Sequence, residues 1–293
     1  MTADQGQIIE VNGVSLYVED HGEGTPVVLV HGWPDSAYLW RHQIPFLTQH
    51  GFRVIAPDMR GFGRSSRPPA VADYALANAV GDVAGILDAL GIGSAHIVGH
   101  DWGAAVAWLT ATYLPDRGGK LVVLSVGHPR APRTLRQDEM AWYKLFFQFE
   151  GIAEATLQYK DWAWLRRFSR GDGDQERNLQ DLSRPGALTA SLNWYRANLA
   201  PRMPGTAPDL PPVTVPTLGV WSTNDHYLDG ERMEKSAACV KAPWRYEVIE
   251  GASHWIPLDA PDRLNELLLD WLRLPQAAER GATSMIPGLF RSL

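Results

Sequence analysis

The fold of this chain is decided by residues 95–113, which read AHIVGHDWGAAVAWLTATY. The apolar run at residues 96–99 predicts a buried strand, and Trp102–Tyr113 predicts a helix directly after it. One glycine stands two positions before Asp101, and another stands two positions after it. This spacing is typical of a nucleophile elbow, a sharp strand-to-helix turn that exposes its central side chain. Glycine tolerates the strained backbone and close contacts that such a turn needs.

The central residue of an elbow is usually serine, but here it is Asp101. A carboxylate needs no base to activate it, and it attacks saturated carbon to give a covalent alkyl ester. The N-terminus of the following helix favours its ionised form. An Asp before a helix is also a common N-cap. The position of Asp101 between two glycines after a buried strand favours the nucleophile.

Outward from the elbow, apolar runs and helical patterns alternate along the chain. This alternation predicts an α/β fold, a mostly parallel sheet with helices on both faces. The expected strands are residues 7–11, 15–19, 26–31, 53–57, 96–99, 120–126, 217–222 and 245–250. The expected helices of the core are residues 36–50, 76–90 and 102–113, and a last helix that begins at Pro261.

The alternation stops at residues 129–212, where helical segments and loops occur without a buried strand. This piece contains a polar loop at residues 171–177 and ends in a proline-rich linker that reaches Pro216. We therefore expect a helical cap at residues 129–212, inserted between core segments 1–128 and 213–293.

An ester intermediate needs a base to hydrolyse it, and the base needs an acid to orient it. His254 comes just after the last expected strand, and Asp225 follows the strand before it. The order Asp101, Asp225, His254 is the nucleophile–acid–histidine order of this architecture. His226 and Asp229 are weaker rivals for the base and the acid.

The loop after the strand at residues 26–31 begins with His31 and continues with Gly-Trp-Pro. We expect the backbone N–H groups of Trp33 and Trp102 to form an oxyanion hole. His31 and His100 lack the accompanying ligands of a metal site, so we do not expect them to bind a metal. Hydrolysis through Asp101 and His254 requires no metal and no organic cofactor. Glycine-rich residues 58–66 lack the Gly-Lys-Ser/Thr ending of a phosphate loop, which favours a structural turn.

The composition excludes several classes of protein. Of the 293 residues, 45% are hydrophobic and 20% are charged, which is ordinary for a folded domain and excludes fibrous or disordered chains. The net charge of −6 argues against a nucleic-acid partner. The single cysteine cannot form an internal disulfide, and no signal peptide or membrane span is visible, so we expect a cytoplasmic protein. A homodimer is compatible with the sequence, which does not determine the oligomeric state.

Together, these motifs resemble the α/β-hydrolase fold, specifically its epoxide hydrolase and haloalkane dehalogenase branch. The resemblance extends over nearly the whole chain and rests on HGWP (31–34), DMRGFGRS (58–65), GHDWG (99–103), the Asp after the seventh strand and the late His. It implies an eight-stranded, mostly parallel sheet with an inserted helical cap domain, and a cis Trp33–Pro34 peptide bond.

Two segments of the insertion resemble the cap of soluble epoxide hydrolases. They are residues 143–154, YKLFFQFEGIAE, and residues 193–196, NWYR. In that family one tyrosine from each segment donates to the epoxide oxygen, and the matching positions are Tyr143 and Tyr195. A phenol can protonate the alkoxide that ring opening produces. The resemblance therefore implies hydrolysis of an epoxide by water to a vicinal diol.

The chain has 12 tryptophans, an unusual number. Five adjoin a predicted site residue or belong to the oxyanion motif, and we expect some of them to line a pocket for an apolar, lipid or aromatic epoxide: Trp33, Trp102, Trp142, Trp194 and Trp255. We expect structural roles for Trp40, Trp108, Trp221, Trp244 and Trp271.

Two other functions stay open. A haloalkane dehalogenase would use the same Asp nucleophile, but the residue after His-Gly, commonly Asn in that family, is Trp33 here. A ligand-binding protein without turnover would be favoured by the loss of a triad member, and none is missing.

Overall fold

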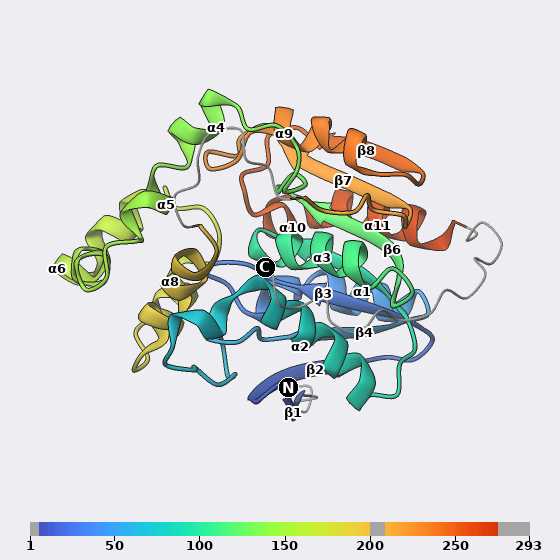
Figure 1. The fold of residues 1–293 in the computed structure, drawn as a ribbon, viewed down its shortest axis with the longest axis horizontal. Coiled ribbons are helices and arrows are strands. Elements are labelled where there is room, and N and C mark those ends of the chain that lie inside the picture. The colour runs from blue at the N-terminus through green and yellow to red at the C-terminus, as the bar shows by residue number, and fades with distance from the viewer. Residues whose placement is uncertain (1–5, 200–208, 275–293) are drawn as a thin grey trace.

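The computed structural model of the protein describes residues 6–199 and 209–274, and its described strands form one sheet (Figure 1). The strand order is β1-β2-β4-β3-β5-β6-β7-β8. The strands are β1 (Gly6–Val11), β2 (Val14–His21), β3 (Thr25–Val30), β4 (Phe52–Pro57), β5 (Ala95–His100), β6 (Gly118–Leu124), β7 (Thr217–Ser222) and β8 (Trp244–Ile249).

The sheet is mostly parallel, as the sequence predicts. The hairpin β1–β2 is antiparallel and pairs antiparallel with β4. All pairings from β4 through β3, β5, β6 and β7 to β8 are parallel. Every residue of β5 is buried, because helices cover both faces of a parallel sheet. The carboxyl ends of the parallel strands therefore meet at one edge, where loops can bring distant residues together.

Helices of the core pack on the sheet in pairs. Helix α2 (Leu76–Ala89) packs on α3 (Trp102–Tyr113), and both lie in front of the sheet in Figure 1. Helix α1 (Gln43–Gln49) packs on α11 (Pro261–Arg273). The shorter core elements are η1 (Ala37–Trp40), η2 (Val71–Tyr74), α9 (Gly230–Lys235), η3 (Ser236–Cys239) and α10 (Ile256–Asp259).

The single helix predicted at residues 36–50 is wrong, because the structure has η1 and α1 there instead. In a continuous helix the N–H of residue 45 would bond the carbonyl of Arg41. Pro45 has no N–H, and its ring would clash with that carbonyl. A new helix, α1, begins at Gln43, so Pro45 falls in its first turn, where proline is tolerated.

Between β6 and β7 the described residues form helices and loops and no named strand. The helices are α4 (Leu135–Met140), α5 (Tyr143–Phe146), α6 (Ile152–Phe168), α7 (Gln175–Leu182) and α8 (Ala187–Asn198). In Figure 1, α4, α5, α6 and α8 gather on the left, beyond one edge of the sheet.

Two details of this segment differ from the sequence prediction or fall outside the structure. The polar loop predicted at residues 171–177 is shorter, because α7 already begins at Gln175. Of the proline-rich linker, residues 200–208 lie outside the described residues. Among the helices that are described, none has the length and apolar character needed to cross a membrane.

Candidate active site

Asp101 lies at the turn from β5 into α3, with a backbone φ of 51° and ψ of −121°. Few non-glycine residues adopt a positive φ, and those that do cluster at functional sites. The flanking glycines are required by close packing. A Cβ at Gly99 would lie 2.2 Å from the carbonyl oxygen of Gly103, and a Cβ at Gly103 would lie 2.0 Å from that of Val30. The elbow therefore forms because the backbone approaches itself at both glycines.

The loop after β3 contacts the Asp101 carboxylate directly. The backbone N–H of Trp33 donates to Asp101 Oδ1 at 2.9 Å. A Cβ at Gly32 would lie 2.4 Å from Asp101 Cβ, so only glycine permits this approach. The Trp33–Pro34 peptide bond is cis, as the resemblance implied. Trp102 begins α3, and its part in the oxyanion hole stays a prediction.

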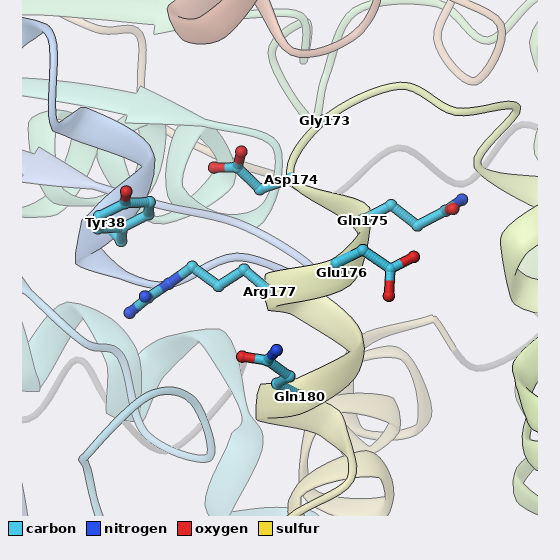
Figure 2. Close-up of a pocket in the computed structure, with 7 residues that line it drawn as sticks. All are labelled: Tyr38, Gly173, Asp174, Gln175, Glu176, Arg177 and Gln180. Carbon is cyan, nitrogen blue, oxygen red and sulfur yellow. The ribbon is translucent and has the colours of Figure 1, made fainter.

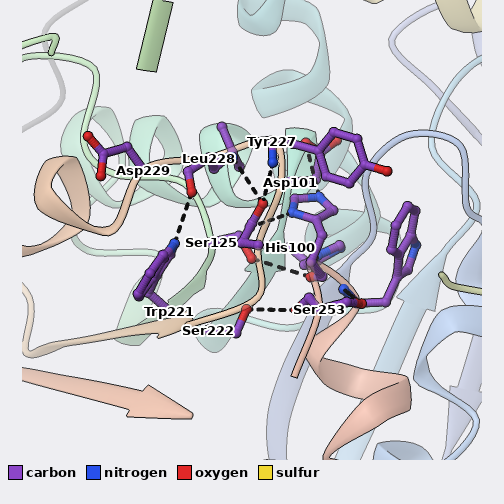
Figure 3. A network of polar contacts seen from close by, with 12 residues as sticks. His100, Asp101, Ser125, Trp221, Ser222, Tyr227, Leu228, Asp229 and Ser253 are labelled. Carbon is purple, nitrogen blue, oxygen red and sulfur yellow. Dashed lines mark hydrogen bonds and ion pairs between the residues drawn. The ribbon is translucent and has the colours of Figure 1, made fainter. Parts of the chain in front are cut away.

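His254 lies between the two predicted carboxylates. Its Nδ1 is 2.8 Å from Asp225 Oδ2, and its Nε2 is 3.7 Å from Asp101 Oδ2. Asp225 Oδ1 accepts two further bonds, from the N–H groups of Tyr227 at 2.8 Å and Leu228 at 2.9 Å. Figure 3 shows the polar contacts around Asp101, His100 and Tyr227. The structure thus brings together three residues that are up to 153 positions apart in the chain (254 − 101).

The charges of these groups support one another. Burial lowers the pKa of His254, but Asp225 and Asp101 outweigh it and raise this pKa from 6.5 to about 10. Burial raises the pKa of Asp101, but His254, with smaller contributions from His100 and the Trp33 N–H, holds it below its usual value. The raised pKa of His254 favours its protonated form, and the lowered pKa of Asp101 favours the carboxylate that faces it.

The rivals predicted for the base and acid lie elsewhere. The His226 side chain is exposed, and Asp229 instead accepts a bond from Thr134 Oγ1 at 2.6 Å. Both ring nitrogens of His31 are engaged, Nδ1 with the carbonyl of Gly32 at 2.9 Å and Nε2 with the N–H of Met59 at 3.0 Å.

Tyr143 at the start of α5 and Tyr195 on α8 are both buried, and their ring centroids lie 6.1 Å apart. Burial raises the pKa of each phenol well above 10, and the negative charge of Asp101 raises it further. Both phenols are therefore protonated and within the electrostatic influence of Asp101.

Four of the five predicted pocket tryptophans are buried around these groups. The rings of Trp33 and Trp102 lie 6.0 Å and 5.1 Å from that of Tyr195. Trp194 packs against Trp102 at 5.8 Å, and Trp255 packs against His254 at 5.2 Å.

Trp142 differs from these four. It is 51% exposed, and its ring contacts lie within the inserted helices, with Phe146, Trp164 and Phe168. The structure does not bring it together with the other predicted pocket residues. Among the tryptophans expected to be structural, Trp40 and Trp108 are fully buried.

Sequence reasoning missed Asp35, a buried carboxylate beside the site. It accepts bonds from Trp255 Nε1 at 2.9 Å and from Asn178 Nδ2, on α7, at 3.1 Å. Burial raises the pKa of Asp35 to about 7, even though these two hydrogen bonds and the charge of His254 act to lower it. The only sequence signal was its place directly after His-Gly-Trp-Pro.

It also missed Tyr227, which stands two residues after Asp225 and contacts His254. No sequence pattern predicts a tyrosine at this position of the loop.

A surface hollow is lined by residues of other elements (Figure 2). It runs from Tyr38 to the first turns of α7, where Asp174, Glu176 and Arg177 line it. None of the predicted site residues belongs to its lining.

Known proteins are similar to this chain in sequence and in fold. The family model described as "alpha/beta hydrolase fold" matches residues 25–261. Epoxide hydrolase A of Mycobacterium tuberculosis (strain ATCC 25618 / H37Rv) is 35% identical to this chain, and the match covers 93% of this chain and 98% of that protein.

Solved structures agree. The crystal structure of epoxide hydrolase A from Mycobacterium thermoresistibile has a TM-score of 0.77 at 30% identity, covering 92% of this chain and 98% of that one. An epoxide hydrolase of the alpha/beta hydrolase superfamily from hot-environment metagenomes has a TM-score of 0.83 at 30% identity, covering 92% and 99%. This chain therefore belongs to the alpha/beta hydrolase fold family, and within it to the epoxide hydrolases.

Proposed function

We propose that this protein hydrolyses an epoxide to a vicinal diol through a covalent ester on Asp101. One observation carries the proposal. The Asp101 carboxylate is held on a strained turn between the Trp33 N–H and His254, and His254 is itself bonded to Asp225. This arrangement supplies a nucleophile, a base and an orienting acid in contact with one another. The names of the relatives support the same reaction.

In the first step an Asp101 oxygen attacks one ring carbon, and the bond from that carbon to the epoxide oxygen breaks. The departing oxygen takes a proton from Tyr143 or Tyr195. Both phenols are protonated, and the alkoxide that forms is a stronger base than a phenolate. Because the two phenols come from α5 and α8, we propose that residues 129–212 act as a cap over the core.

In the second step His254 takes a proton from water, and the water oxygen attacks the carbonyl carbon of the ester. The bond from that carbon to the substrate oxygen then breaks. The departing oxygen takes up one of the two water protons to complete the diol, the other proton stays on His254, and the Asp101 carboxylate is restored.

Ester formation removes the negative charge of Asp101, one of the charges that raise the pKa of His254. His254 therefore releases its proton more readily once the ester has formed. The phenolate left by the first step can take up this proton, which restores the phenol and leaves His254 neutral, ready to act as a base. The Trp33 N–H, already on Asp101 Oδ1, is placed to hold the oxyanion, together with that of Trp102.

The aromatic side chains around the site suit an apolar substrate. The ring of Phe147 lies 5.4 Å from Trp33 and 4.9 Å from Tyr195, and all three side chains are buried. Aromatic surroundings of this kind favour a lipid or aromatic epoxide. The Trp33 indole N–H already donates to Ser191 Oγ at 3.1 Å, so it is engaged and not available to hold a halide.

A single turnover in ¹⁸O-water, with enzyme in excess, tests the ester. We expect label in the Asp101 peptide and none in the diol, because water repairs the carboxylate and the diol oxygen comes from it. His254→Gln should accumulate alkyl-enzyme, visible as added mass on the intact protein. Label that appears directly in the diol would show attack by water and remove Asp101 as nucleophile.

A substrate screen tests the reaction class. Styrene-type and fatty epoxides are compared with chloro- and bromoalkanes. We expect diol without halide release. Halide release would favour a dehalogenase, and neither product would favour a binding protein.

A further inference from the structure

The side chain of Tyr227 links the loop after β7, which also carries Asp225, to the inserted helices. The chemistry proposed above gives this side chain no role. It lies between β7 and α9 and is 6% exposed. Its phenol oxygen donates to the carbonyl of Phe168, the last residue of α6, at 2.9 Å. Burial raises the pKa of this phenol, so it remains a donor at neutral pH and above.

The Tyr227 ring touches both ends of the proposed chemistry. Its centroid lies 5.4 Å from that of His254, with the two rings inclined at 71°. It also lies 6.1 Å from the ring of Tyr143 and 5.9 Å from that of Trp255. One buried ring therefore packs against the proposed base and against a proposed proton donor.

The backbone of Tyr227 is engaged as well. Its N–H donates to Asp225 Oδ1, the oxygen that does not face His254. Its carbonyl accepts a bond at 3.1 Å from Nε2 of Gln137, on α4, and Gln137 Oε1 accepts one from the N–H of Asp229 at 2.9 Å. Displacing this residue would shift the carboxylate that orients His254.

We infer that Tyr227 is a positioning residue that holds His254 in place for ester hydrolysis and makes its orientation depend on how the inserted helices sit on the core. The inference rests on the proposed function. The phenol anchors the ring to α6, the ring supports the imidazole, and the N–H fixes Asp225. His254 acts as a base only in the second step, whereas proton donation in the first step is shared by Tyr143 and Tyr195.

Transient kinetics of the two steps test this role. In Tyr227→Leu we expect ester hydrolysis to slow by about tenfold, because a misplaced base loses part of the rate gain that general-base catalysis supplies. We expect the rate of ester formation to change less. Alkyl-enzyme should then accumulate. Tyr227→Phe keeps the ring against His254 and loses the anchor on Phe168, so we expect a smaller effect on the same step.

Tyr74→Phe is the matched control, because Tyr74 is also buried and its phenol also donates to a backbone carbonyl, that of Pro68, at 2.8 Å. We expect it to leave the ratio of the two rates unchanged. A substitution that only destabilises the fold would lower the amount of active enzyme, and with it the amplitude of the transient, but would leave this ratio unchanged. Equal slowing of both steps in Tyr227→Leu would overturn the inference.

A second readout needs no substrate. We expect a downfield proton NMR signal from the Nδ1–H of His254 bonded to Asp225. We expect this signal to move in Tyr227→Leu and not in Tyr74→Phe. An unmoved signal would overturn the inference even if the kinetics changed. If the wild-type enzyme forms no alkyl-enzyme, the proposed function fails, whereas an alkyl-enzyme with an unchanged rate ratio in Tyr227→Leu sinks only the role of Tyr227.

Discussion

Asp101 combines two properties that the structure provides together. Its backbone sits at a positive φ, which places its side chain at the end of β5, and its carboxylate is kept ionised by His254 and the Trp33 N–H. The two glycines of the elbow allow the first property, because a Cβ at either would collide with backbone. The second property depends on residues from two other loops.

Tyr143 and Tyr195, the proposed proton donors, give a prediction at this scale. Tyr143→Phe or Tyr195→Phe alone should reduce turnover without abolishing it, because the other phenol still donates. The double change should lose much more, since general-acid help is worth about 10²–10⁴-fold. Steady-state rates of the four proteins on one epoxide check this. A double variant with wild-type turnover would remove both phenols from the mechanism.

At the scale of elements, the glycine-rich turn at residues 58–66 is held by buried polar contacts. Asp58 accepts bonds from the N–H groups of Ala37 and Arg64, at 2.8 and 2.7 Å. Arg60 forms a two-pronged pair with Asp82 on α2, at 2.7 and 2.6 Å, and both side chains are buried. These contacts agree with a structural turn and not with a phosphate loop.

Breaking this pair should be costly. Arg60→Met leaves the Asp82 carboxylate buried without its charged partner and, among the described residues, with only the amide of Asn12 donating to it at 3.2 Å, so we expect a loss of about 3–5 kcal/mol in the free energy of unfolding. Arg133→Met is the comparison, because Arg133 pairs with Asp138 on the exposed surface, where an ion pair contributes about 0–1 kcal/mol. Urea unfolding of both variants measures the difference. Similar losses would contradict the importance assigned to the buried pair.

For the whole molecule, the charged site predicts how stability changes with pH. The pKa of His254 is raised from 6.5 to about 10 in the folded protein, so the folded state binds more protons in this range. The stabilisation is fully present below pH 6.5 and is lost as the pH rises towards 10. We therefore expect the free energy of unfolding of the wild type, minus that of His254→Gln, to fall across this range.

Urea unfolding of both proteins at several pH values checks the slope. Titrating groups away from the site are common to both proteins, so their contributions cancel in the difference. A difference that stays constant with pH would mean that His254 is not held as an imidazolium in the folded protein.

Local sequence determined much of this protein. Trp102–Tyr113 and Thr217–Ser222 are a helix and a strand with the predicted bounds. They were readable because a short apolar run is typical of a buried strand and a longer one, directly after the elbow, of a buried helix. The elbow was readable because its glycines and Asp101 lie within five consecutive residues. The roles of Asp101 and its partners stay predictions, although the structure places them in contact.

Tertiary structure decided the rest, because it depends on contacts between segments far apart in the chain. Trp142 and Trp194 both neighbour predicted cap tyrosines in sequence, yet one is half exposed and the other buried beside Trp102. Asp35 becomes a buried carboxylate only because Asn178 and Trp255 reach it from distant segments. Tyr227 meets Phe168 and His254 only when α6 lies over the loop after β7, and no periodicity in the sequence records such a meeting.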